Sequence, residues 1–148
     1  MTTLLIKDTN YSNVIWESII NKIQDIIRNE YNVSPYISST FNSKSLSPFR
    51  VEPISHSTNE LYVGAWNKSY EISINYYFKK EDTESFYKKL YQEAERLYQL
   101  FFNNQGASSS DSKLSGFLNG RPEGLNIVQI GNYFNIEVIF ICDILGTY

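Results

Sequence analysis

The sequence predicts an α+β fold, in which two amphipathic helices pack on a single, mostly antiparallel sheet that ends in a C-terminal β-hairpin. Two segments carry apolar residues at the helical period, and the stretch YEISINYYF alternates at the period of a strand. Near the C-terminus, a Gly-Asn pair separates two β-prone runs. Because there is neither an internal repeat nor a second core, residues 1–148 are expected to form one domain.

The first helix is expected to begin at Ser12 or Asn13, either of which can cap it, and to run to about Tyr31. Its charged residues lie opposite a stripe of isoleucines, which indicates a helix that packs on another element. The stripe consists of Ile15, Ile19, Ile23, Ile26 and Ile27.

Prolines and serines punctuate residues 33–60, which we expect to fold into short strands and turns. The segments that favour an extended chain are Tyr36 to Phe41 and Phe49 to Val51.

The stretch YEISINYYF, Tyr70 to Phe78, predicts a strand with one buried face and one partly wet face. The run from Leu61 to Trp66 is expected to pair with it through a turn at Asn67-Lys68.

The second helix is expected to follow a cap at Asp82 or Thr83 and to cross the whole sheet, because about 20 residues at about 1.5 Å each span roughly 30 Å. Glu84 in its first turn suits the helix dipole. The expected buried stripe is Phe86, Leu90, Ala94, Leu97 and Phe101.

Residues 103–122 are polar and rich in glycine and serine, and they predict a long polar loop. Loops of that length inside compact domains are usually either functional or mobile.

The longest apolar stretch, Asn126 to Ile144, is interrupted by polar residues and so does not predict a membrane helix, which needs about 20 mostly apolar residues. It predicts instead a hairpin with Gly131-Asn132 as its turn. The core face of the second strand is expected to carry Phe134, Ile136, Val138, Phe140 and Cys142, and the other face Asn135, Glu137, Ile139, Ile141 and Asp143. Ile139 and Ile141 then need cover from a helix or from another subunit.

The composition limits the classes of function. A net charge of −3 argues against a broad basic face for nucleic acid, although DNA sliding through a neutral passage remains compatible. The aromatic content of 16% suits a core or a subunit interface. With one cysteine and no secretory signal at the N-terminus, a cytosolic protein is expected.

The sequence carries no catalytic, cofactor or metal signature, so no residue is assigned to such a role and no enzyme is expected. A cysteine-nucleophile site would pair Cys142 with the single histidine, His56, and with an acid such as Asp143 or Glu52. Cys142, however, lies on the predicted core face, where a thiol usually acts as a small hydrophobe.

In their order, these elements resemble the tail terminator (tail completion) proteins of long-tailed bacteriophages. The resemblance rests on the N-terminal helix, the strand YEISINYYF that leads into the helix YQEAERLYQLF, the long polar loop, and the closing hairpin LNIVQIGNYFNIEVIFICDI. It covers most of residues 12–144 and is a likeness of pattern and size.

The resemblance implies a structural virion protein of the tail or neck that is made in the bacterial host cytoplasm. It implies a hexameric ring on the end of the tail tube, which stops tail polymerisation and provides the joint to the head. The implied partners are further copies of the chain, the tail tube protein and a head-completion protein. DNA would pass through the ring without sequence-specific binding, and no membrane, cofactor or enzyme activity is implied.

Two surfaces are predicted to contact these partners. The long loop suits the tube or the ring lumen, and tyrosines beside the core stripe of the second helix suit either the core margin or a neighbour. The predicted interface residues are Ser108, Ser109, Ser110, Lys113, Phe117 and Arg121 in the loop, and Tyr87, Tyr91 and Tyr98 in the helix.

Three other functions stay open. The chain has the size of other head-tail connector subunits. A small-ligand-binding or enzymatic α+β domain would use Trp66, Tyr70 and Tyr76 as a pocket, and it predicts a monomer with a deep cavity. A toxin-neutralising protein would bind one basic partner tightly.

Overall fold

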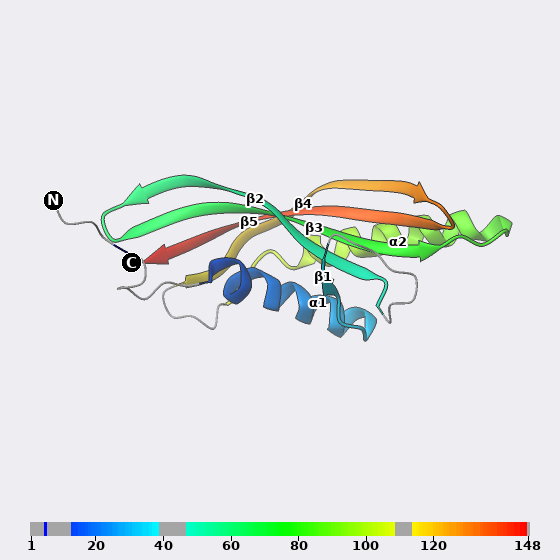
Figure 1. The fold of residues 1–148 in the computed structure, drawn as a ribbon, viewed down its shortest axis with the longest axis horizontal. Coiled ribbons are helices and arrows are strands. Elements are labelled where there is room, and N and C mark those ends of the chain that lie inside the picture. Colours follow the sequence, from blue (N-terminus) through cyan, green and yellow to red (C-terminus); the bar gives the residue numbers. More distant parts are fainter. Residues whose placement is uncertain (1–4, 6–12, 39–46, 109–113, 148) are drawn as a thin grey trace.

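The computed structural model describes residues 5, 13–38, 47–108 and 114–147. These form an α+β fold with two helices and one five-stranded sheet, which is mostly antiparallel (Figure 1). The strand order is β1-β2-β3-β5-β4, and only the β1–β2 pair is parallel. The strands are β1 (Tyr36–Ile37), β2 (Phe49–Tyr62), β3 (Ala65–Lys79), β4 (Leu114–Ile130) and β5 (Tyr133–Thr147).

The N-terminal helix starts at one of the two predicted caps. The side-chain Oδ1 of Asn13 accepts a hydrogen bond from the backbone N of Trp16 at 3.2 Å, whereas Ser12 lies outside the described residues. A π-helical turn, η2 (Trp16–Ile20), continues into α1 (Asn21–Tyr31). The helix ends where Asn32 adopts a left-handed φ of 59°, a conformation that asparagine tolerates better than most residues.

The core lies between the helices and one face of the sheet. The residues expected to form the stripe of α2 (Glu84–Asn103) are all buried, and Phe86 and Phe101 contact Phe134 and Phe140 of β5 with ring centroids 5.5 and 5.3 Å apart. On the β2 and β3 side, Tyr31 of α1 contacts Phe49 at 4.7 Å. Both helices therefore cover the same face of the sheet, as Figure 1 shows.

Strand β2 corrects the prediction for residues 33–60. The short strand β1 lies within the predicted Tyr36 to Phe41 segment, of which residues 39–41 fall outside the described part, but β2 is a single strand of 14 residues. Two features allow β2 to contain Pro53. β1 pairs only with Arg50 and Val51, so beyond them the outer edge of β2 has no partner strand that would need a backbone N–H. The register with β3 also shifts directly after Pro53.

The turn between β2 and β3 was also predicted in the wrong place. Asn67 and Lys68 lie inside β3, and the chain reverses at Val63 and Gly64, between the paired residues Tyr62 and Ala65. Gly64 has a φ of +80°, which a residue without a side chain adopts at no steric cost.

Most of the second half of the predicted 103–122 loop is strand. β4 begins at Leu114 and pairs with β5 through Arg121 and Pro122, with three shifts of register. The coil before it is tied to β4, because Ala107 N donates to Phe117 O at 3.0 Å and Gly120 N donates to Gln105 O at 2.7 Å. The loop prediction failed here because Leu114 and Phe117 are buried core residues inside a sequence that is otherwise small and polar.

The last two strands are antiparallel neighbours along most of their length. Ile130 pairs with Tyr133, so the chain reverses at Gly131 and Asn132, and Gly131 has a φ of +59°. The alternation in β5 places Phe134, Ile136, Val138, Phe140 and Cys142 in the core, as the sequence predicted.

Candidate interaction surface

Neither helix covers the opposite face of the sheet, which is mainly polar (Figure 1). The register of β3 with β5 places alternate residues of both strands on it. From β3 these are Ser69, Glu71, Ser73, Asn75 and Tyr77, and from β5 they are Asn135, Glu137, Ile139, Ile141 and Asp143. Ile139 and Ile141 are half-buried on this face, and the first helix, which was one candidate for their cover, lies on the other side.

A chain of hydrogen bonds orders the middle of this open face. Asn135 Nδ2 donates to Asn75 Oδ1 at 3.0 Å, and Asn75 Nδ2 donates to Ser73 Oγ at 2.9 Å. Ser73 Oγ then donates to Glu137 Oε2 at 2.7 Å. Ser73 and Asn75 are only 3% and 7% exposed, so these bonds satisfy polar groups that would otherwise be costly to bury. The chain runs across β3 and β5 and fixes the relative positions of these side chains.

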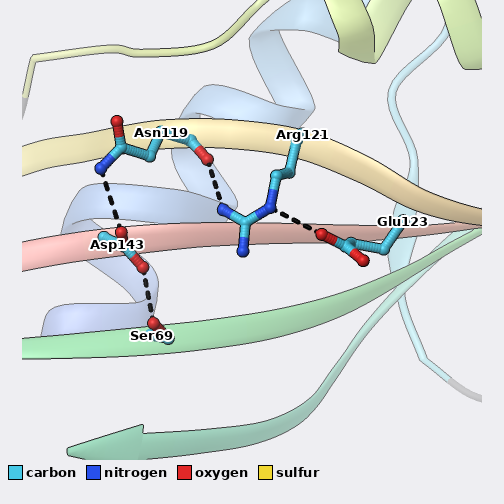
Figure 2. A network of polar contacts seen from close by, with 5 residues as sticks. All are labelled: Ser69, Asn119, Arg121, Glu123 and Asp143. Carbon is cyan, nitrogen blue, oxygen red and sulfur yellow. Dashed lines mark hydrogen bonds and ion pairs between the residues drawn. The ribbon is translucent and has the colours of Figure 1, made fainter. Parts of the chain in front are cut away.

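A second network lies further along the same face (Figure 2). Asp143 accepts from Ser69 Oγ at 2.6 Å and from Asn119 Nδ2 at 3.1 Å, which links β3, β5 and β4. Arg121 donates from Nη1 to the carbonyl O of Asn119 at 2.9 Å and from Nε to Glu123 at 2.6 Å. Arg121, a predicted interface residue, is therefore held on the surface with its charge paired.

A shallow depression next to Arg121 has a volume of about 190 Å³. It is lined by Ser55, His56, Ser57, Ser69, Tyr70, Glu71, Arg121 and Ile141. Ligand pockets usually measure about 300–1,000 Å³. The depression is therefore too small for a typical cofactor or drug-sized ligand.

The aromatic pocket considered from the sequence is not formed. Trp66 and Tyr70 are 7% and 4% exposed, and Tyr76 is half-buried against Phe49 and Tyr31 under the helices. Of these three, only Tyr70 borders the shallow depression. The sheet carries them on its covered face, which leaves no aromatic surface there for a ligand.

The possible cysteine-nucleophile pair is not assembled. His56 pairs with Tyr70 across β2 and β3, and Tyr70 pairs with Cys142 across β3 and β5, so two strand spacings of about 4.8 Å separate His56 from Cys142. The ring of Tyr70 stacks on His56 at 5.5 Å. Burial, with a smaller effect from Asp143, raises the pKa of the Cys142 thiol to about 12, which keeps it neutral. Asp143 itself points to the opposite face.

The tyrosines of α2 fall into two groups. Tyr87 and Tyr91 are 50% and 58% exposed, and Tyr98 is half-buried. Their positions at 100° per residue place all three on the side of α2 that faces away from Arg96 and α1. Tyr87 also contacts Phe134 of β5 at 6.0 Å between ring centroids, so this side of the helix lies toward the β5 and β4 side of the sheet.

The loop residues predicted to contact partners have different outcomes. Phe117 was wrongly predicted as an interface residue, because it is fully buried and packs on Phe140 with ring centroids 5.5 Å apart. Ser108 is exposed in the coil before β4. Ser109, Ser110 and Lys113 lie outside the described residues.

Sequence reasoning missed Asn119 and Ser69 as members of the polar network. Asn119 falls in the segment predicted to be a loop, and with a φ of 53° it lies inside the shift of register between Leu118 and Arg121 of β4. The alternation of β5 correctly placed Asp143 on the open face. Ser69 could have been identified as its partner only from the register of β3 with β5, which the sequence does not give.

In the described part of the chain, no helix is long and apolar enough to cross a membrane. Among the same residues, no three His, Cys, Asp or Glu side chains gather in a way that could hold a metal ion. A scan against protein-family models finds no match for this sequence, and no curated protein matches it either.

Proposed function

We propose that this chain is a structural virion protein of a long-tailed bacteriophage, a tail terminator that forms a ring on the end of the tail tube. The ring stops tail polymerisation and provides the joint to the head. In this proposal the two amphipathic helices packed on the sheet and the C-terminal hairpin form the rigid body of each subunit. The proposal includes no enzyme activity, cofactor or membrane.

One observation carries this proposal: on the face of the sheet that neither helix covers, hydrogen bonds order polar side chains beside two half-buried isoleucines. Surface that combines apolar side chains with fixed polar groups is typical of protein interfaces. Two depressions among the described residues have volumes of about 190 and 210 Å³, which are smaller than those of usual ligand pockets.

The partners in this proposal are further copies of the chain, in a hexameric ring, together with the tail tube protein and a head-completion protein. DNA passes through the ring without sequence-specific contacts, in keeping with a net charge of −3. The protein acts in the tail or neck of the virion after assembly in the host cytoplasm. Another head-tail connector subunit would share these surfaces and differ in its position in the virion.

Disruption of the gene in the virus that encodes this chain tests the proposal. We expect electron micrographs to show heads that carry no tail and free tails of irregular, excessive length. Supplying the protein from a plasmid should restore joined virions with tails of uniform length. Normal virions in its absence would contradict the proposal, and free tails of normal length would favour the connector alternative.

A further inference from the structure

The outer edge of β4 is free over half of its length. β4 is the last strand of the sheet, and the coil at Gln105 and Ala107 hydrogen-bonds to it only at Gly120 and Phe117. Beyond Gly120, no described backbone group pairs with its outer edge. The free edge ends at the tip of the molecule where β4 turns into β5, drawn in orange in Figure 1.

From Gly124 onward this edge lacks the features that usually prevent strand pairing, whereas Arg121, Pro122 and Glu123 supply charges and a proline just before it. Residues 124–130, GLNIVQI, contain neither a charged residue nor a proline. By contrast, the outer edge of β2 beyond β1 contains Glu52, Pro53 and Glu60. Proteins commonly protect exposed edges with charges, prolines or bulges, so the unprotected edge of β4 is suited to accept another strand.

Apolar side chains flank the free edge on both faces. Val128 and Ile130, on the open face, are 55% and 51% exposed. On the helix side, Tyr87 contacts Phe134, the residue that pairs with Gln129 of β4, and Tyr91 lies about one turn further along α2; both are about equally exposed. An added strand would hydrogen-bond to the edge and place its alternate side chains against these two groups, the arrangement used when a peptide extends a sheet.

The N-terminal segment Thr2 to Ile6 has the composition that such a strand requires. Its sequence, TTLLI, is uncharged and rich in β-favouring and apolar residues, and five residues span about 17 Å, which fits within the free edge. Leu5, the described residue of this segment, is 44% exposed and so is not packed in the core of its own chain. The first helix begins on the side of the molecule away from the tip of β4, which favours the edge of a neighbouring copy (Figure 1).

We propose that the free edge of β4 binds the N-terminal segment Thr2 to Ile6 of a second copy of this chain as a sixth strand. Because each copy has one segment to donate and one edge to accept, the contact is head-to-tail and closes a ring when the rotation between copies allows it. The inference rests on the ring proposed above and supplies its subunit contact.

Cysteine cross-linking of the full-length chain tests this contact. Leu5→Cys and Val128→Cys are made as separate proteins in a Cys142→Ala background, mixed and oxidised. We expect a disulfide-linked dimer from the mixture and little from either protein alone. Val128→Cys dimers alone would mean that two β4 edges pair with each other, and no dimer in any sample would mean that this edge is not a contact; both results overturn the proposal.

Two further variants separate this contact from the function. The doubly substituted chain should form cross-links between chains, and a cross-link within one chain would show that the segment binds its own edge and overturn the proposal. Val128→Lys should weaken self-association by about tenfold or more, equivalent to about 1.4 kcal/mol, whereas Asn29→Lys, the same substitution at an exposed position of α1, should not. If the protein forms a closed hexamer but Leu5→Cys and Val128→Cys do not cross-link, only the proposed strand contact is wrong. If they cross-link but the copies form open-ended assemblies and no ring, only the terminator function is wrong.

Discussion

Cys142 is kept as a neutral thiol by its position in the middle of β5. It is fully buried beside Tyr70, and burial raises the pKa of both groups, from 9.0 to about 12 for the thiol and from 10.0 to about 12 for the phenol. Since the folded state favours their neutral forms, their contribution to stability is complete below the unfolded pKa values. It is lost as pH rises through the interval between the unfolded and folded values.

We therefore expect the free energy of unfolding to fall as pH rises above about 9. Urea unfolding at several pH values measures this. In Cys142→Ala the decline should begin nearer pH 10, where buried tyrosines such as Tyr70 and Tyr31 contribute, and an unchanged profile would contradict the account. The same burial predicts that the thiol reacts with a colorimetric thiol reagent only in denaturant.

At Gly146 the neighbouring side chains leave no room for a larger residue. A Cβ at this position would overlap the indole ring of Trp66, which is itself buried. Gly124 lies in the neighbouring strand, and there a Cβ would meet only Ile139 Cγ1, at 4.0 Å.

Gly146→Ala should lower the free energy of unfolding by about 1–3 kcal/mol, the usual cost of overpacking a core. Gly124→Ala is the matched control and should unfold close to the wild type. Equal stability of the two variants in urea would show that Trp66 is not fixed against Gly146.

At the scale of elements, a single arginine connects the two helices. Arg96 of α2 donates from Nε to Glu30 Oε1 at 2.9 Å, and its guanidinium lies over the ring of Tyr31 at 4.3 Å from the centroid. The hydrogen bond with Glu30 raises the pKa of Arg96, and burial raises the pKa of the Tyr31 hydroxyl. This cluster fixes α1 beside α2 on the same face of the sheet.

A double-mutant cycle with Glu30→Gln and Arg96→Met should give a coupling energy of about 0.2–1 kcal/mol, because both side chains are about 40% exposed and solvent screens the pair. Arg96→Met should cost more than Glu30→Gln, because it also removes the contact with Tyr31. Equal costs, or no coupling at low salt, would contradict this role.

The elements also show which parts of the fold the sequence could predict. β5 and α2 were predicted residue by residue because their apolar positions repeat without interruption over the whole element. β2 was not, because His56, Ser57 and Thr58 carry no alternation and Pro53 argued against a strand. Its 14 residues are held by pairing with β3, which is information from distant residues.

In the candidate interaction surface, too, some residues could be predicted from local sequence and others depend on pairing with distant residues. Tyr87 and Tyr91 could be chosen from the sequence because they lie beside the core stripe of the helix, and Arg121 because it ends a polar segment; the structure leaves all three exposed. Phe117 could not be recognised as core, because a single aromatic residue among glycines and serines has no period. The link between Asp143 and Asn119 depends on the shift of register between Leu118 and Arg121 in β4, which no local pattern encodes.

At the scale of the whole molecule, the chain has one covered and one open sheet face, and the free edge of β4 reaches one tip of an elongated body (Figure 1). The helices, the sheet and the α1–α2 cluster together form a core that needs no partner to bury its largest side chains. The open face, the tyrosines of α2 and the edge of β4 are all available for contact. These are the surfaces that the proposed ring would use.

The mass of the purified protein, measured by light scattering behind a sizing column over a range of concentrations and with added tail tubes, tests the central proposal most directly. We expect the mass to rise from 17.2 kDa toward six times that value, either as concentration increases or when tubes provide a template. A mass that stays at 17.2 kDa under every condition, with no binding to tubes, would contradict the ring.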